Sequence, residues 1–214
     1  MKATPITTIF TDIGGVLLTN GWDHHARLLA TKTFAFDFEE MESVHRLFSD
    51  TYELGKITLD EYLRRVVFYR KRSFTRDQFI EFMYAQSRPY SAMLDLVKKL
   101  KEQHRLKVVA VNNEGREIND YRIRHFHLGE LIDFFVSSCT LHVRKPDEEI
   151  FRLALQLAQV IPQEVVYLED RLLFVQIAEE LGIRSIHHTD IESTQAKLAE
   201  MGLSVEHGTL YVPE

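Results

Sequence analysis

The sequence predicts an α/β fold in which a parallel sheet carries helices on its faces and one helical segment is inserted. From residue 91 onward, helical and strand patterns alternate, and such alternation produces right-handed crossovers and a parallel sheet. Between residues 19 and 88 the apolar residues recur at helical spacing with almost no strand signal. We therefore expect an α/β core made of residues 1–18 and 89–214, and a helical cap insertion over residues 19–88.

The first strand is predicted near the N-terminus. Residues 8–18 begin with a β-branched and aromatic run that reaches Asp12 and then turns at Gly14 and Gly15. This pattern is typical of a buried strand, and open α/β sheets bind ligands at the carboxyl ends of their strands. Asp12 is therefore expected to face a cleft, although this segment alone fits an ordinary strand-to-turn aspartate equally well.

The insertion contains two helix-start signals. Thr58-Leu-Asp-Glu61 and Thr75-Arg-Asp-Gln78 both match a capping box, which predicts helices beginning near residues 59 and 76. Two earlier helices are expected over residues 23–34 and 39–52. The insertion should therefore form a small helical bundle.

The alternating part of the chain predicts nine further elements. They are helix 91–103, strand 106–111, helix 116–125, strand 133–138, helix 147–159, strand 164–168, helix 172–181, strand 184–187 and helix 191–201. Two of the strands run directly into polar side chains, Asn112 and Asn113 in one case and Glu169 and Asp170 in the other. Paired acids at such a strand end suit a hard divalent cation.

Four segments, taken in order, resemble the motifs of the haloacid dehalogenase (HAD) superfamily of phosphohydrolases. The most specific of these segments are Asp12-Ile-Gly-Gly-Val-Leu-Leu, Lys145-Pro-Asp-Glu-Glu-Ile-Phe and Leu168-Glu169-Asp170 with a helix ending at Leu181-Gly182. The polar amide of Asn112 is the second motif in chain order. The resemblance covers nearly the whole chain and implies a Rossmann-like parallel sheet core of the HAD type with an inserted helical cap. The Asp-x-Gly-Gly form is similar to a subgroup that includes sugar-phosphate phosphatases with a small helical cap.

The resemblance also implies a reaction. Asp12 would attack the phosphorus of a phosphomonoester and form an aspartyl-phosphate, which water then hydrolyses. Lys145 would stabilise both the nucleophile and the transferring group. Asn112, together with the backbone amide of Asn113, would donate hydrogen bonds to the phosphate.

A Mg²⁺ cofactor is implied by the same resemblance. Its ligands would be the Asp12 carboxylate, the backbone carbonyl of Gly14 and Asp170, with Glu169 binding directly or through water. The implied substrate is a small phosphorylated metabolite, and a sugar phosphate fits the subgroup.

Two residues depart from the usual family pattern. Gly14 stands where many family phosphatases carry a second aspartate that acts as general acid and base, a role worth roughly 10² to 10⁴ in rate. Asn112 replaces the usual serine or threonine. These departures keep open a second function, in which the protein binds a phosphorylated ligand or protein partner with weak or no catalysis. A metal-free dehalogenase fits less well, because Glu169 and Asp170 would repel a carboxylate nucleophile.

Composition narrows the class of protein further. The chain has 214 residues, 45% of them hydrophobic, a net charge of −6 and one cysteine, Cys139. One cysteine permits no intrachain disulfide and indicates a reducing compartment. The net negative charge, without a run of basic residues, argues against nucleic acid as a binding partner. The sequence has no apolar run long enough to span a membrane. We expect a cytoplasmic monomer or homodimer.

Several other side chains invite functional interpretations. The pairs His24-His25 and His187-His188 lack a further ligand at zinc spacing, so loop or surface positions are expected. Trp22 could stack on substrate or pack at the base of the cap. Lys56 is expected to be a solvated loop lysine.

Overall fold

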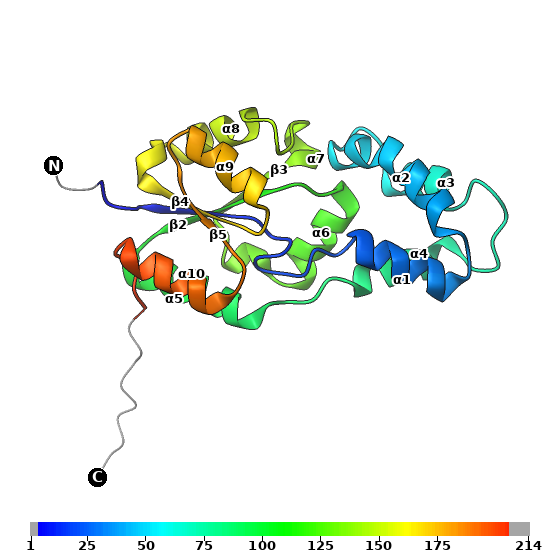
Figure 1. Cartoon of the computed structure of the whole chain (residues 1–214), viewed down its shortest axis with the longest axis horizontal. Coiled ribbons are helices and arrows are strands. Elements are labelled where there is room, and N and C mark those ends of the chain that lie inside the picture. The colour runs from blue at the N-terminus through cyan, green and yellow to red at the C-terminus, as the bar shows by residue number, and fades with distance from the viewer. Residues whose placement is uncertain (1–3, 206–214) are drawn as a thin grey trace, which may run out of the picture.

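The computed structural model describes residues 4–205 and contains a five-stranded parallel sheet with helices on both faces (Figure 1). The strands are β1 (Thr8–Thr11), β2 (Lys107–Asn112), β3 (Phe134–Ser137), β4 (Val165–Glu169) and β5 (Arg184–His187). Their order is β3-β2-β1-β4-β5, and every pairing is parallel. The predicted α/β class is confirmed.

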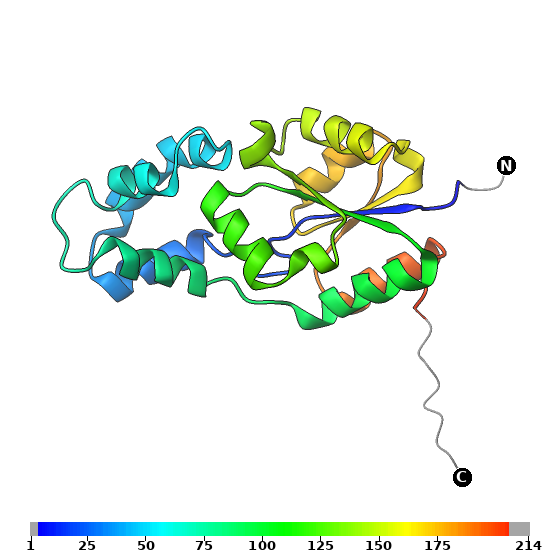
Figure 2. The same cartoon turned by 180° about the vertical axis from the view of Figure 1, so that it is seen from behind.

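Alternate residues of the central strand face opposite sides of the sheet. Ile9 lies in a cluster with α5 (Ser91–His104) and α10 (Ile191–Glu200), whereas Phe10 lies in a cluster with α8 (Glu149–Ala158) and α9 (Leu172–Glu180). Figures 1 and 2 show these two helix pairs on either side of the sheet. The sheet is thus buried on both faces, which explains its nearly continuous apolar strands.

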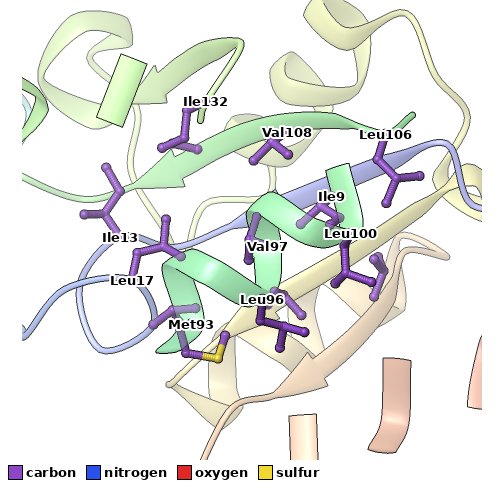
Figure 3. Close-up of a cluster of buried hydrophobic side chains, with 14 of the residues drawn as sticks. Ile9, Ile13, Leu17, Met93, Leu96, Val97, Leu100, Leu106, Val108 and Ile132 are labelled. Carbon is purple, nitrogen blue, oxygen red and sulfur yellow. The ribbon is translucent and has the colours of Figure 1, made fainter. Parts of the chain in front are cut away.

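Helix α5 shows how the sequence covers one face. Met93, Leu96, Val97 and Leu100 recur at helical spacing and are all buried. Figure 3 shows them directed at the sheet, close to Ile9 and Val108. An amphipathic stripe of this width is what a helix needs to dock on a sheet.

Helices α1 (His24–Phe34), α2 (Phe38–Glu53), α3 (Leu59–Val66) and α4 (Arg76–Ala85) lie together beyond one end of the sheet (Figures 1 and 2). They surround a hydrophobic cluster of their own, which includes Tyr62 and Phe79. Both predicted capping boxes are present, on Thr58 and Thr75. Each satisfies backbone N–H groups that the first helical turn leaves without a partner.

The two connections between this helical segment and the sheet run side by side. Leu18 and Pro89 form an antiparallel bridge, and the Thr19 N–H donates to the Arg88 carbonyl at 2.9 Å. Farther out, the Ser138 hydroxyl donates to the Glu53 carbonyl at 2.7 Å. The segment is therefore tied to the core at its base and along α2.

The remaining elements of the described chain are short or lie between the sheet and the helical segment. They are α6 (Arg116–His125), η1 (Leu128–Glu130), α7 (Ser138–Leu141) and η2 (Pro162–Glu164). No helix of the described residues is both long and apolar enough to cross a lipid bilayer.

Several predicted boundaries are displaced by one or two residues, and two of them have an identifiable physical cause. The strand expected over 133–138 ends at Ser137, and Cys139 lies in α7, because the Ser138 hydroxyl is bonded to the neighbouring Glu114 and Glu53 backbone. The helix expected over 147–159 begins at Glu149, since the Asp147 N–H first closes a turn on the Arg144 carbonyl at 2.9 Å.

Candidate active site

The polar strand ends meet at one edge of the sheet. Asp12 directly follows β1, Asn112 ends β2 and Glu169 ends β4. Because β1 lies between β2 and β4, the three side chains come from adjacent strands. This edge faces the helical segment (Figure 1).

Lys145 connects two of the carboxylates. Its side chain is fully buried, and Nζ lies 3.1 Å from Asp12 Oδ2 and 2.7 Å from Glu169 Oε2. Burial alone would lower the pKa of Lys145, but the charges of Asp12 and Glu169 outweigh it and raise that pKa. The site therefore holds a permanent cation against the carboxylate of Asp12.

Both carboxylate oxygens of Glu169 accept hydrogen bonds from the protein. The Tyr167 hydroxyl donates to Oε2, and the Arg171 N–H donates to Oε1 at 3.0 Å. Burial favours a raised pKa for Glu169, but Lys145 holds it below the ordinary value. Glu169 is thus an ionised counter-charge with its oxygens already bonded.

Asp12 has a different environment. The Ile13 N–H donates to Oδ1 at 2.8 Å. Burial raises the pKa of Asp12 to about 7, against the lowering effect of Lys145. A buried carboxylate of this kind gains most from a further cation nearby.

Asp170 supplies the feature that points to such a cation. Asn20 donates to Asp170 Oδ2 at 2.9 Å, whereas Oδ1 is buried and has no hydrogen-bond partner. Asp12, Glu169 and Asp170 each offer an oxygen within 4.8 Å of the others, and they form the one acidic or histidine group suited to a metal among residues 4–205. An all-oxygen ligand set with an unpartnered buried oxygen fits a hard divalent cation.

The two asparagines of the second motif are held by the protein. Asn112 donates to Asn119 Oδ1 at 2.9 Å and accepts from the Ser137 hydroxyl at 2.8 Å. The Asn113 side chain forms two hydrogen bonds with the backbone of Lys145, at 2.8 and 2.9 Å. Both residues line the central cavity, and Asn113 fixes the chain that carries Lys145.

A cavity of about 350 Å³ opens between the sheet edge and the helical segment. Its lining includes Asp12, Gly14, Asn20, Trp22, Asp23, His24, Arg27, His45, Ser49, Tyr52, Glu53, Tyr62, Asn112, Asn113, Glu114, Arg122, Arg144, Lys145, Arg171 and Phe174. Charged and hydrogen-bonding groups dominate this set. The cavity therefore suits a polar, anionic ligand of small size.

Trp22 packs against other side chains of the helical segment and also lines the cavity. Its indole N–H donates to the Tyr62 hydroxyl at 2.9 Å, and its ring meets Phe79 edge to face at 5.6 Å between centroids. Lys56 is exposed and is absent from the cavity lining.

Four residues of this region were not predicted from the sequence. Tyr167 had a usable signal, since it lies two residues before Glu169 on a strand and so shares its face. Asn20 lies in an irregular loop, and the sequence carries no signal for its role. Glu114 and Arg122 form a buried ion pair, at 2.9 Å, that only the tertiary structure brings together.

Fold and site together define an α/β protein whose acidic and lysine groups lie at the carboxyl edge of a parallel sheet. The chain belongs to the haloacid dehalogenase-like hydrolase family, whose family model matches residues 6–182.

Curated relatives include phosphatases. The chain is 27% identical over 132 residues to a phosphorylated carbohydrates phosphatase of Thermotoga maritima, covering 62% of this chain and 56% of the relative. It is 26% identical over 114 residues to the sesquiterpene phosphatase astK of Aspergillus oryzae, covering 53% of this chain and 58% of the relative. The matches thus span less than two thirds of these relatives.

Among solved structures, the chain is similar to the HAD family enzyme bt-2542 of Bacteroides thetaiotaomicron. The TM-score is 0.72 at 23% identity, covering 86% of this chain and 93% of that one. That bacterial enzyme has also been crystallised with magnesium and inorganic phosphate. At this identity the likeness shows a shared fold.

Proposed function

We propose that the protein is a Mg²⁺-dependent phosphomonoester hydrolase that acts on a small phosphorylated metabolite through an aspartyl-phosphate. One observation carries this proposal: Lys145 bridges Asp12 and Glu169 while the buried Oδ1 of Asp170 has no partner. The site thus contains a carboxylate, a fixed cation and an unpartnered oxygen suited to a second cation. Phosphatase relatives and the family membership support the same reaction class.

Asp12 is the proposed nucleophile. Its Oδ1 accepts from the Ile13 N–H, and its Oδ2 lies beside Lys145, so the carboxylate is held in one orientation. Orientation of this kind lowers the entropy cost of in-line attack on phosphorus. Lys145 lies close enough to share its positive charge with a phosphoryl group attached to Asp12.

We propose that Asp12, the Gly14 carbonyl and Asp170 hold Mg²⁺. Glu169 has an indirect role as a neighbouring negative charge that does not bind the ion itself. The bonds that Glu169 makes to Lys145, Tyr167 and Arg171 favour this indirect role. When bound, Mg²⁺ neutralises negative charge on the phosphoryl oxygens.

Asn112 and Asn113 are proposed to orient the phosphate. Asn112 uses one amide hydrogen on Asn119 and keeps a second, and its carbonyl oxygen is fixed by Ser137. The amide is therefore set by the protein before any ligand arrives, which favours recognition of a phosphate oxygen at low entropy cost.

The helical segment over residues 19–88 is proposed to act as a cap that selects the leaving group. It contributes Arg27, His45 and Tyr62 to the cavity, whereas the core contributes Arg144. These side chains favour a hydroxylated or carboxylated metabolite, such as a sugar phosphate, over a long apolar chain.

The test is a screen of the purified protein against phosphorylated metabolites, with and without Mg²⁺. We expect phosphate release from at least one polar phosphomonoester, loss of release after metal removal, and loss of release in Asp12→Asn. Tight binding of a phosphorylated ligand without turnover of any phosphomonoester would instead support the non-catalytic function.

A further inference from the structure

The side chains of Asn20 and Arg122 lie close to Gly14 and Gly21. A Cβ added to Gly14 would lie 3.7 Å from Arg122 Nη1 and 2.8 Å from Asn20 Oδ1, and a Cβ added to Gly21 would lie 1.9 Å from Arg122 Nη2. Gly21 also has a positive φ of 67°. Gly21 therefore leaves room for the guanidinium of Arg122, whereas a side chain at position 14 would collide with Asn20 and come only into ordinary contact with Arg122.

Arg122 is fixed in this space. It is 2% exposed, its Nε donates to the Ser87 hydroxyl at 3.0 Å, and its Nη2 donates to the Thr19 carbonyl at 2.9 Å. The remaining nitrogen, Nη1, lies 2.9 Å from Glu114 Oε2. The guanidinium thus spans the distance between Gly14 and the carboxyl of Glu114.

Glu114 lines the same cavity as Asp12, Gly14 and Lys145. Its N–H donates to the Ser138 hydroxyl at 3.0 Å, and its Oε1 has a long contact of 3.3 Å with the Gly115 N–H. With Oε2 held by Arg122, Oε1 is the oxygen left to carry a proton. The residue is 9% exposed, so it is largely shielded from bulk water.

We propose that Glu114, held by Arg122, is the general acid and base of the active site and replaces the carboxylate that position 14 lacks. This assignment rests on the proposed phosphatase function. It makes Glu114 a catalytic residue and Arg122 a positioning residue.

The proton transfers balance in both half-reactions. As the Asp12 carboxylate forms a bond to phosphorus and the bond from phosphorus to the leaving oxygen breaks, Glu114 gives its proton to that oxygen. The ionised Glu114 then takes a proton from water as the water oxygen attacks phosphorus and the bond to Asp12 breaks. Phosphate leaves, and both carboxyl groups return to their starting states.

The surroundings of Glu114 favour a titration near neutrality. Burial raises the pKa of Glu114 to about 7, Arg122 opposes this shift, and the charge of Glu53 on α2 supports it. Tyr52, also on α2, is buried and neutral, because burial keeps the pKa of its hydroxyl well above the ordinary value. A group that titrates near the working pH is an efficient proton donor and acceptor.

The test compares kcat/KM of wild type and Glu114→Gln on an alkyl and an aryl phosphate. The ratio kcat/KM reports the steps up to release of the leaving group. We expect a loss of about 10² to 10³-fold on the alkyl phosphate and of less than about 10-fold on the aryl phosphate, whose leaving oxygen needs no proton. The fall of alkyl kcat/KM above about pH 7 should disappear in the variant.

Glu42→Gln is the matched control, because Glu42 is also buried and also pairs with an arginine, Arg27, but lies outside the cavity lining. Its losses should be equal on the two substrates. Glu114→Asp keeps a titrating carboxyl, so it should retain the fall of alkyl kcat/KM above neutral pH and the wild-type difference between the alkyl and aryl phosphates. This variant replaces Glu114→Gln in the test if Glu114→Gln does not fold.

The assignment would be overturned if Glu114→Gln lost kcat/KM equally on both substrates, or if its pH profile matched that of wild type. The proposed function would still stand in that case, provided that turnover depends on Asp12. If Glu114→Gln does not fold, a Glu114→Asp profile without the fall above neutral pH would overturn it. Absence of wild-type turnover on every phosphomonoester would overturn the proposed function itself, and this assignment with it.

Discussion

At the scale of single residues, Lys145 organises the site. It is a fully buried ammonium held between Asp12 and Glu169, so its charge is paired at each end. Such a charge is stable only while its partners remain, and the same holds for the carboxylates around it.

Replacing Lys145 should therefore affect stability as well as catalysis. In Lys145→Met the carboxylate of Glu169 would stay buried without its cation, and we expect a loss of about 3–5 kcal/mol in the free energy of unfolding. Urea denaturation measures this. Adding Glu169→Gln should recover most of the stability and none of the phosphatase activity; an unchanged unfolding free energy in Lys145→Met would contradict the buried pairing.

Tyr167 tests the support behind the metal site. Its hydroxyl donates to Glu169 and lies 3.1 Å from Lys145 Nζ. Tyr167→Phe removes this donor with little change in shape, and we expect Mg²⁺ affinity to fall about 10 to 100-fold. Calorimetric titration with Mg²⁺ measures the effect, and an affinity equal to that of wild type would show that Tyr167 does not influence the site.

At the scale of elements, the helical segment combines an apolar cluster with buried polar pairs. Trp22 donates to the Tyr62 hydroxyl, which in turn contacts His45 Nδ1 at 2.6 Å. Donation of the one Tyr62 hydrogen to His45 requires an unprotonated Nδ1 on that ring. A neutral His45 with this tautomer satisfies the arrangement.

This requirement predicts a pH-dependent stability. Burial lowers the pKa of His45 from 6.5 to about 4 in the folded protein. Because of this lowered pKa, the contribution of neutral His45 to the stability of the folded protein is fully present above pH 6.5. It is lost as the pH falls toward 4, because His45 is protonated first in the unfolded chain. Between pH 7.5 and pH 4.5, the free energy of unfolding of His45→Gln should fall by about 1–3 kcal/mol less than that of wild type, as measured by urea denaturation. Equal losses would contradict the prediction.

The contact between α2 and the core can be tested with glycines. Gly55 has a φ of 64°, and a Cβ there would lie 2.1 Å from the Cys139 carbonyl oxygen. Gly55→Ala should therefore destabilise the protein by about 1–3 kcal/mol. Gly129→Ala is the control, since no heavy atom lies within 4 Å of the added carbon, and it should change stability by less than about 0.5 kcal/mol. Thermal unfolding of the two variants decides, and similar melting temperatures would argue against a close contact.

At the scale of the whole molecule, the topology assembles the site. Asp12 and Lys145 are far apart in sequence, but β1 lies at the centre of the sheet and its end adjoins those of β2 and β4. Much of this could be predicted, since strand ends that carry Asp12, Asn112 and Glu169 must share one edge of a parallel sheet. The helix starts at Thr58 and Thr75 were likewise readable, because capping is local.

Other features depend on tertiary packing and leave no local pattern. The position of Arg122 over Gly14 requires α6 to pack beside the first loop, and the pairing of Asn112 with Asn119 and Ser137 depends on three elements. Because of these contacts, a carboxylate introduced at position 14 would meet Asn20 and Arg122 rather than open space.

The most direct test of the central claim is to trap the proposed intermediate on Asp12. The protein is mixed with a phosphomonoester that it hydrolyses, with or without Mg²⁺, and quenched with borohydride, which reduces an aspartyl-phosphate to homoserine. Peptide mass spectrometry should find homoserine at position 12, with both substrate and Mg²⁺ required. Phosphate release that continues with unmodified Asp12 in every sample, or that persists in Asp12→Asn, would contradict the account.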